Sequence, residues 1–196
     1  MQTIGGGVPS VPGAGEWNLK KTVVMVGMMG AGKTAVGRAL ATRLGVPFLD
    51  SDAEIEAAAT MSIAEIFERD GEAFFRDRET EVIDRLLENQ RGILSTGGGA
   101  FLSERNRQII SQKGISVWLD ADLDLLWNRV KHKNTRPLLR TSNPRETLKT
   151  LYEARVPSYR KADLAVRSLA EYSIDAMAGH VVEALLARAD VLEKNT

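Results

Sequence analysis

The chain has 196 residues, of which 43% are apolar and 27% are charged, a composition typical of one globular domain with its own hydrophobic core. The 26 Lys and Arg residues balance 26 Asp and Glu residues, which argues against general binding to nucleic acid or to a membrane surface. Cysteine is absent, so disulfides and thiolate-bound metals are excluded. No apolar run approaches the ~20 residues of a transmembrane helix. The N-terminus lacks a secretory signal, and we expect a cytoplasmic protein.

The first part of the chain differs from the rest in composition. The stretch "IGGGVPSVPGAG", residues 4–15, is rich in glycine and proline. Such a composition is typical of a flexible segment. We therefore predict a flexible arm over residues 1–21 and a single domain over residues 22–196.

From residue 22 onward, short apolar runs alternate with helical patterns. The runs predict strands at 22–27, 47–50, 92–96, 115–119 and 164–167. Helices are predicted at 32–44, from Ser62, at 71–90, 103–113, 122–131 and 143–159, and from Ile174. This alternation indicates an α/β fold with a parallel sheet, and such sheets bind ligands at the carboxyl ends of their strands.

A phosphate-binding motif follows the first of these strands. "GMMGAGKT", residues 27–34, fits the pattern G-x-x-x-x-G-K-[ST] and lies between a strand and a helix. Its glycines let backbone N–H groups turn toward phosphate oxygens, and the helix N-terminus adds a positive dipole end. Lys33 can reach the β- and γ-phosphates, and the Thr34 hydroxyl can bind Mg²⁺. The motif predicts a nucleoside triphosphate and Mg²⁺.

Two carboxylates follow the second predicted strand. In "FLDSD", Asp50 and Asp52 occupy alternate positions of an extended segment, so both side chains can face the phosphate loop. One can help to hold Mg²⁺, and the other can accept a proton from an attacking hydroxyl. The alternative is that Asp52 only caps the helix that follows.

The stretch "FFRDRE" places Arg76 and Glu79 three residues apart on one helix face. Arg76 can bind an anionic substrate while Glu79 orients it; the alternative is an ordinary surface ion pair. The segment from Arg129 to Arg145 holds six Lys or Arg residues and no acidic residue. It predicts a lid at about 132–142 with Arg136 touching the triphosphate, or else a solvated basic loop. A nucleic-acid patch is less favoured, because aromatic residues for base stacking are lacking.

Three consecutive glycines, Gly97, Gly98 and Gly99, follow the strand predicted at 92–96. A tight turn explains one glycine but not three. Together with the other motifs, they make the chain resemble the shikimate kinase family from about residue 22 to about residue 190. The motifs that carry the resemblance occur in that family's order: "GMMGAGKTAVGRALA", "FLDSDAEIE", "SIAEIFERDGEAFFRDRE", "ILSTGGGAF", "RPLL" and "ARVPSYRKAD".

The resemblance implies ATP-dependent phosphorylation of the 3-hydroxyl of shikimate, a step toward chorismate and the aromatic amino acids. It also implies a three-layer P-loop kinase fold whose five-stranded parallel sheet has the order 2-3-1-4-5 and is flanked by helices. The ATP-binding residues by resemblance are Gly30, Ala31, Gly32, Lys33, Thr34, Ala35, Arg129 and Arg136. Arg129 would lie against adenine, and Thr34 would hold Mg²⁺ with help from Asp50.

On the acceptor side, the resemblance implies a second group of residues that bind shikimate. These are Asp52, Arg76, Glu79, Gly97, Gly98, Gly99 and Arg155. Asp52 would bind the hydroxyls and act as the base, whereas Arg76 and Arg155 would clamp the carboxylate. The catalytic residues would be Lys33, Asp52 and Arg136. The glycine backbone would lie against the ring of the substrate, where a β-carbon would occupy its space.

Other functions stay open at this point. A related enzyme could phosphorylate gluconate or a nucleoside monophosphate. A P-loop switch would bind nucleotide without an acceptor, although the guanine-reading N-K-x-D motif of GTPases does not occur in the sequence. We expect a monomer that acts on small molecules and binds neither nucleic acid nor membrane. The match is unclear after Asp163, so no residue beyond Asp163 is assigned to adenine.

Overall fold

The computed structural model of the chain describes residues 15–133 and 136–196. Its centre is a parallel sheet of five strands in the order β3-β4-β2-β5-β6. The strands are β2 (Thr22–Val26), β3 (Phe48–Asp50), β4 (Ile93–Ser95), β5 (Gly114–Asp120) and β6 (Leu164–Arg167). Counted from the first strand of this sheet, the order is 2-3-1-4-5, so the predicted topology is confirmed.

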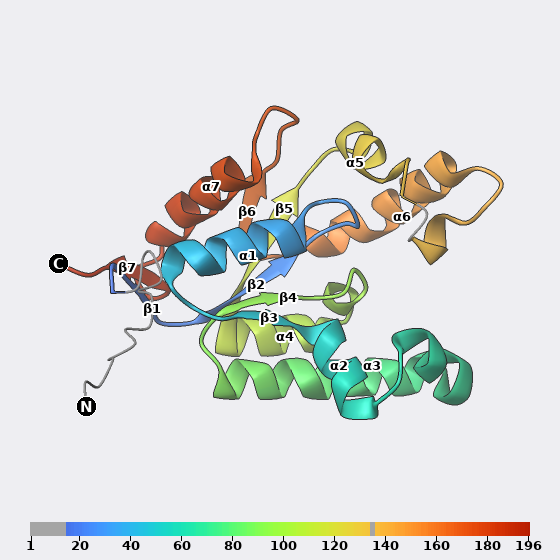
Figure 1. Cartoon of the computed structure of the whole chain (residues 1–196), viewed down its shortest axis with the longest axis horizontal. Coiled ribbons are helices and arrows are strands. Elements are labelled where there is room, and N and C mark those ends of the chain that lie inside the picture. The colour runs from blue at the N-terminus through green and yellow to red at the C-terminus, as the bar shows by residue number, and fades with distance from the viewer. Residues whose placement is uncertain (1–14, 134–135) are drawn as a thin grey trace, which may run out of the picture.

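Helices cover both faces of the sheet (Figure 1). On one face α1 (Lys33–Leu44) packs beside α7 (Ile174–Leu186), and on the other α3 (Ile63–Asn89) packs beside α4 (Glu104–Lys113). The middle strand β2 is buried along its whole length, as a short apolar run requires when both faces are covered. The remaining helical elements are α2 (Ser51–Ala59), α5 (Leu123–Val130), α6 (Pro144–Tyr159) and the short 3₁₀ turns η1 (Ala100–Leu102) and η2 (Pro137–Leu139).

The long helix α3 contains a break. Ser62 caps its N-terminus, and Glu65 completes the predicted capping box. Gly71 has φ 85° and ψ 171°, which are not helical values, so the chain kinks there. The helix predicted from Ser62 and the one predicted over 71–90 are therefore both present, joined end to end. The second segment carries Arg76 and Glu79.

A second, smaller sheet corrects the predicted N-terminal arm. Trp17–Leu19 form strand β1, which pairs antiparallel with β7 (Leu192–Lys194). Leu19 is buried in the hydrophobic core, so the folded body begins before residue 22. Residues 1–14 of the predicted arm lie outside the described residues. Sequence periodicity misses both strands because each has only three residues and its partner is at the opposite end of the chain.

The parallel strands all end at the same edge of the sheet. β2 leads into the phosphate loop, β3 into α2, and β4 into the three glycines. Figure 1 shows α5 and α6 beyond this edge, whereas β1 and β7 lie at the other end of the sheet. The edge formed by the carboxyl ends is therefore where the predicted residues can meet.

Over the described ranges, no helix combines the length and the apolar character that a membrane span needs.

Candidate active site

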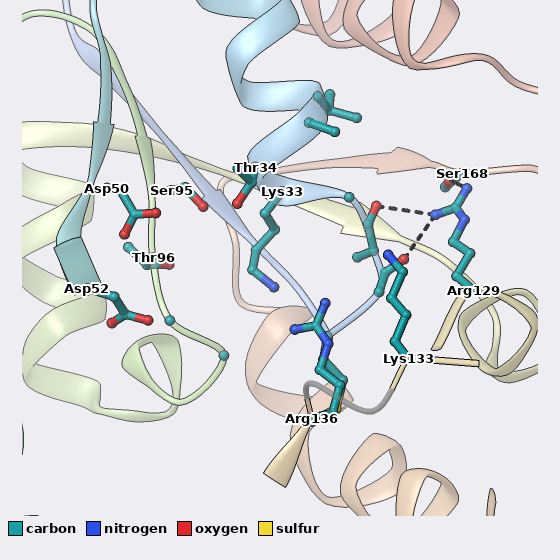
Figure 2. A pocket seen from close by; sticks show the side chains of 18 of the residues that line it. Lys33, Thr34, Asp50, Asp52, Ser95, Thr96, Arg129, Lys133, Arg136 and Ser168 are labelled. Carbon is teal, nitrogen blue, oxygen red and sulfur yellow. Dashed lines mark hydrogen bonds between the residues drawn. The ribbon is translucent and has the colours of Figure 1, made fainter. Parts of the chain in front are cut away.

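A cleft of about 900 Å³ opens at the carboxyl ends of the strands. Figure 2 shows Asp50 and Asp52 on one side of Lys33 and Arg129 on the other. Nearly all of the predicted site residues line this cleft: Gly30, Ala31, Gly32, Lys33, Thr34, Ala35, Asp50, Asp52, Arg76, Gly97, Gly98, Gly99, Arg129, Arg136 and Arg155. Glu79 does not line it, but it forms an ion pair with Arg76. The fold thus brings the two predicted groups together in one space.

The phosphate loop needs glycine for its backbone conformation. Gly30 has φ +82° and Gly32 has φ +93°, values that side chains with a β-carbon rarely adopt. Gly30 also lies against Val130 of α5, where a β-carbon would come within 2.7 Å of Val130 Cγ1. Gly32 is the N-cap residue of α1 and makes no side-chain cap. The loop therefore presents the start of α1 to the cleft, as an anion-binding helix N-terminus requires.

Lys33 folds back onto the loop. Its Nζ donates hydrogen bonds to the carbonyl oxygens of Gly27 at 2.7 Å and Met28 at 3.0 Å. Burial lowers the pKa of Lys33 to about 8, with Arg136 and Arg155 contributing and Asp52 opposing the shift. A nearby anion would stabilise the charged form of an ammonium group that lies close to two guanidinium groups. Phosphate oxygens in the cleft would supply that negative charge.

Arg129 ties the phosphate loop to the far edge of the sheet. One of its guanidinium nitrogens, Nη1, donates to the carbonyl oxygens of Gly30 at 3.2 Å and Ala31 at 3.3 Å. The other, Nη2, donates to the hydroxyl of Ser168 at 3.3 Å, just beyond β6. Figure 2 places Ser168 next to Arg129, with Lys33 nearer the carboxylates. Arg129 thus supports the loop while its guanidinium group lines the cleft.

The helix cap next to β3 is Asp50 and not Asp52. Asp50 Oδ1 accepts a hydrogen bond from the backbone N–H of Ala53 at 3.1 Å, so the interpretation of Asp52 as only a cap is wrong. Asp52 lies in the first turn of α2 rather than on an extended segment, so the alternation argument does not apply to it. Both carboxylates nevertheless line the cleft, because the start of α2 turns Asp52 toward Gly97.

Asp52 holds a buried oxygen atom that is unsatisfied. Its Oδ1 has no hydrogen-bond partner among the described residues. Burial raises the pKa of Asp52, the carboxylates of Asp50 and Glu56 raise it further, and Lys33 and Arg76 lower it. Such an oxygen can accept a hydrogen bond from a water molecule or from a ligand group in the cleft. A substrate hydroxyl would satisfy it.

Arg76 and Glu79 form a partly buried pair and not the surface ion pair considered as the alternative. Arg76 Nη1 lies 2.8 Å from Glu79 Oε1, and the Glu79 side chain is only 1% exposed. Burial raises the pKa of Glu79, whereas the hydrogen bond and the charge of Arg76 lower it. Because Glu79 fixes one end of the guanidinium group, Arg76 is held in position before any ligand arrives.

The three glycines make room for three charged side chains. A β-carbon on Gly97 would come within 3.0 Å of Asp52 Oδ1, and one on Gly98 within 2.9 Å of Arg155 Nη1. A β-carbon on Gly99 would come within 2.5 Å of Arg76 Nη2. None of the three has a positive φ. These glycines therefore serve close approach without a special backbone conformation, whereas Gly30 and Gly32 of the phosphate loop both need a positive φ.

The predicted lid is described only in part, because residues 134–135 lie outside the described residues. Arg136 precedes the turn η2 and lines the cleft. Its Nε is buried and has no hydrogen-bond partner within the described part of the chain. Figure 2 shows its guanidinium group near the end of the Lys33 side chain. Arg136 is thus available to an anion beside Lys33; closure of a lid stays a prediction.

Several residues of the cleft are not predicted from the sequence. Beyond β6 and at the start of α7 they are Ser168, Ala170, Tyr172, Ser173, Ile174 and Met177, and at the end of β4 they are Ser95 and Thr96. Their common signal is position, since each group follows or ends a parallel strand. Residue type alone gives no such signal, because small and apolar side chains serve equally well in a core. Ser168 lies beside Arg129, on the side of the cleft away from Asp52.

The fold and the phosphate loop define the chain as a P-loop protein in which the phosphate loop, two carboxylates and two further arginines line one cleft. A family model described as "Shikimate kinase" matches residues 29–186. The chain belongs to the shikimate kinase family.

Individual relatives agree with this assignment. The "Shikimate kinase" of Ruegeria pomeroyi is 73% identical over 175 residues, which cover 89% of this chain and 90% of that protein. The "Shikimate kinase" of Cereibacter sphaeroides is 66% identical over 89% of this chain and 87% of its own. Among solved structures, the shikimate kinase of Acinetobacter baumannii in complex with shikimate has a TM-score of 0.78 and 39% identity. That match covers 86% of this chain and 94% of the other.

Proposed function

We propose that the protein transfers the γ-phosphoryl group of ATP to the 3-hydroxyl of shikimate, a step toward chorismate and the aromatic amino acids. The main support is the buried Oδ1 of Asp52, which has no donor among the described residues. A ring hydroxyl of the acceptor can donate to it. The names of the relatives and the shikimate bound to the Acinetobacter baumannii protein support the same acceptor.

The acceptor's carboxylate fits between Arg76 and Arg155. Both guanidinium groups approach the glycine loop, at Gly99 and Gly98 respectively. Planar guanidinium groups suit a carboxylate because each can donate two parallel hydrogen bonds. With the carboxylate held there, the ring would extend over Gly97 toward Asp52. Hydroxyl and carboxylate recognition would thus come from opposite ends of the same three-residue loop.

The nucleotide occupies the remainder of the cleft. Its phosphates would lie on the loop from Gly30 to Ala35, and Lys33 would leave the carbonyl oxygens of Gly27 and Met28 to meet them. The adenine ring would lie on the side of Arg129. Ile174 at the start of α7 is 53% exposed and lines the cleft, so it offers apolar surface to a base. ATP and shikimate would then meet near Lys33 and Asp52.

Thr34 and Asp50 suit a Mg²⁺ ion that binds with the nucleotide. Mg²⁺ prefers oxygen ligands and is commonly held by one or two protein groups together with phosphates and waters. Both side chains line the cleft, and Asp50 uses only Oδ1 to cap α2. The described residues contain no cluster of three His, Cys, Asp or Glu that could hold a metal alone, so phosphates would complete the site. When bound, the ion neutralises charge on the phosphates.

In the transfer, the 3-hydroxyl oxygen bonds to the γ-phosphorus as the bond from that phosphorus to the β–γ bridging oxygen breaks. Asp52 accepts the hydroxyl proton, and its raised pKa suits this exchange. The leaving oxygen keeps the electron pair of the broken bond and departs as part of ADP. Lys33 and Arg136 stabilise the negative charge that spreads over the transferring group.

The acceptor is tested by measuring ADP release with purified protein, ATP and Mg²⁺. Shikimate, gluconate, AMP and no acceptor are compared in parallel. We expect release to depend on shikimate and shikimate 3-phosphate to accumulate in equal amount. Faster release with gluconate or AMP would identify a different small-molecule kinase. Equal release without any acceptor would indicate a nucleotide switch or hydrolase instead.

We also propose that the protein acts as a cytoplasmic monomer. One chain supplies the phosphate loop, Asp52 and both arginines, so the transfer does not require a second copy. Light scattering on the purified protein tests the oligomeric state directly. A stable dimer at the concentrations used for the activity assay would contradict it.

A further inference from the structure

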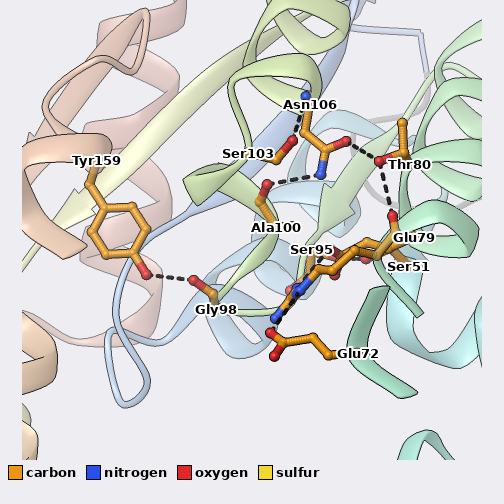
Figure 3. Close-up of polar contacts among 11 residues, drawn as sticks. Ser51, Glu72, Glu79, Thr80, Ser95, Gly98, Ala100, Ser103, Asn106 and Tyr159 are labelled. Carbon is orange, nitrogen blue, oxygen red and sulfur yellow. Dashed lines mark hydrogen bonds and ion pairs between the residues drawn. The ribbon is translucent and has the colours of Figure 1, made fainter. Parts of the chain in front are cut away.

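The glycine loop is anchored by two buried side chains that do not line the cleft. Tyr159, at the end of α6, donates its hydroxyl to the Gly98 carbonyl oxygen at 2.7 Å. Asn106, on α4, donates its Nδ2 to the Ala100 carbonyl oxygen at 2.9 Å. Each of these residues is only 1% exposed. Figure 3 shows the loop between them.

The direction of the first anchor sets the direction of a backbone N–H group. The Gly98 carbonyl points at Tyr159, which lies outside the cleft lining. In a planar trans peptide the carbonyl and the following N–H point in opposite directions. The N–H of Gly99 therefore faces away from Tyr159, toward the cleft that Gly98 and Gly99 line. Within the described residues it donates no hydrogen bond.

The anchors also connect the loop to the helices that carry the two arginines. Tyr159 lies one helical turn after Arg155 on α6. Asn106 Oδ1 accepts a hydrogen bond at 2.7 Å from the hydroxyl of Thr80, the residue after Glu79 on α3. The Thr80 hydroxyl is also 3.0 Å from the Arg76 carbonyl oxygen. Hydrogen bonds therefore link the loop to α6 at Tyr159, four residues after Arg155, and through Asn106 and Thr80 to the backbone of α3 at Arg76.

We propose that Tyr159 and Asn106 are positioning residues that aim the Gly99 N–H at the acceptor's carboxylate, between the guanidinium groups of Arg76 and Arg155. This inference rests on the proposed function, since it needs an acceptor with a carboxylate. Three donors then converge on one carboxylate. The two anchors hold the Gly99 N–H where it can bind the same carboxylate as the two guanidinium groups. Neither positioning residue lines the cleft.

The burial of Tyr159 keeps it suited to this task. A backbone carbonyl can only accept, so Tyr159 must be the donor in their hydrogen bond. Burial raises the pKa of Tyr159, which keeps the hydroxyl protonated, although Arg155 opposes the shift. The ring stacks on Trp118 with centroids 6.4 Å apart and is held independently of the hydroxyl. Removing only the hydroxyl should therefore leave the packing in place.

Steady-state kinetics of Tyr159→Phe test the inference. Because the carboxylate is held equally before and during transfer, a weakened donor should raise KM for shikimate with little change in kcat. We expect KM for shikimate to rise about three- to thirty-fold, the effect of weakening one hydrogen bond to a charged group. KM for ATP should stay within about twofold. Tyr152→Phe is the matched control, since Tyr152 is on the same helix, is partly buried and does not line the cleft.

A double-mutant cycle with Arg76→Ala separates positioning from general loss of structure, because Arg76 would bind the same carboxylate, whereas Arg155 is a direct neighbour of the Tyr159 hydroxyl. If Tyr159 acts through the shared carboxylate, the two effects on shikimate affinity should be non-additive. If both KM values rise together with a fall in Tm, or if KM for shikimate is unchanged, the inference is overturned. Should Tyr159→Phe be too unstable to assay, Asn106→Asp removes the donor to Ala100 and must give the same selective rise.

The wild-type protein provides the first comparison. Wild-type turnover that does not depend on shikimate would overturn the proposed function and this inference together. Shikimate-dependent wild-type turnover with unchanged kinetics in Tyr159→Phe would overturn only the inference.

Discussion

At the scale of single residues, two glycine clusters in the same cleft have different physical reasons. Gly32 has φ +93°, but open space surrounds the position of its missing β-carbon apart from Val36 Cγ2 at 3.6 Å. Gly99 has φ −92° and ψ −12°, which any residue can adopt, but its missing β-carbon would meet Arg76. Gly32 is therefore suited to its position because of its backbone conformation, whereas Gly99 is suited to its position because a side chain there would collide with Arg76.

This difference predicts that adding one methyl group impairs different properties at the two positions. Gly99→Ala should displace the Arg76 guanidinium group and weaken shikimate binding by about tenfold or more, as for the loss of a charge-assisted contact. Its Tm should change little, because the backbone is unstrained. Gly32→Ala should instead lower Tm and weaken ATP binding, by strain on the order of 1 kcal/mol. Calorimetric binding and thermal unfolding of both variants check this, and a Gly99→Ala protein that binds shikimate normally would contradict it.

Asp52 allows a second test at this scale. Asp52→Asn keeps the size of the side chain but removes its negative charge and its ability to accept the proton. We expect kcat to fall by roughly 10²–10⁴-fold with ATP affinity largely kept. The helix should remain intact, because Asp50 provides its cap. Rapid-quench or steady-state rates measure the effect, and near-normal kcat would remove Asp52 from the catalytic residues.

At the scale of elements, α3 and α6 each deliver one arginine to the glycine loop. Arg76→Ala and Arg155→Ala should each weaken shikimate binding by about 1.5–3 kcal/mol, while ATP affinity changes little. Arg78→Ala is a matched control on α3, since Arg78 pairs with the exposed Glu81 away from the cleft. Isothermal titration with each ligand measures the difference. Loss of ATP affinity with shikimate binding intact would contradict the assignment of Arg76 and Arg155 to shikimate binding.

The segment after α5 contributes Arg136, whose buried Nε has no partner among the residues that the structure describes. Arg136→Ala should lower kcat by about 10²–10³-fold, the usual effect of losing one donor to developing charge. Arg136→Lys should be less severe, because it keeps the charge but loses the planar fork. Lys131→Ala, which removes a nearby positive charge outside the cleft, serves as the control.

Single-turnover rates with saturating shikimate and ATP distinguish these variants. If Arg136→Ala and Lys131→Ala reduce the rate equally, general positive charge matters and Arg136 has no specific role. If Arg136→Ala leaves the rate intact, the basic stretch is the solvated loop that the sequence also allows.

At the scale of the whole molecule, the β1–β7 sheet fastens the two ends of the described chain to each other. Trp17–Leu19 pair with Leu192–Lys194, and Lys194 forms an ion pair with Glu16 at 3.3 Å. Leu19 is buried, and burial of such a side chain contributes about 1.5–3 kcal/mol. This contribution comes from outside the parallel sheet and away from the cleft.

Two truncations of the N-terminal segment should therefore differ clearly in their effect on Tm. Removing residues 1–20 takes away β1 and should lower Tm by about 4–10 °C for a chain of this size. Removing residues 1–14 leaves every described contact of β1 in place and should change Tm little. Differential scanning calorimetry of both proteins measures the effect. Equal Tm values for the two truncations would show that β1 adds no stability.

Much of this protein follows from its sequence alone. Short buried runs alternating with helices specify the α/β class, and most strands and helices of the parallel sheet lie within a few residues of their predicted positions. The phosphate loop is recognisable because its glycines, Lys33 and Thr34 are adjacent in the chain. A motif of this kind can be recognised from the sequence because residues that are adjacent along the chain are also close in space.

The tertiary structure decided the features that depend on distant residues. It assigned the helix cap to Asp50, buried Glu79 behind Arg76, and paired β1 with a strand near the other end of the chain. It also showed that each glycine of the loop faces a charged side chain from a different helix. These facts arise because the sheet brings the ends of separate strands to one edge, and the space between side chains there exists only once the chain has folded.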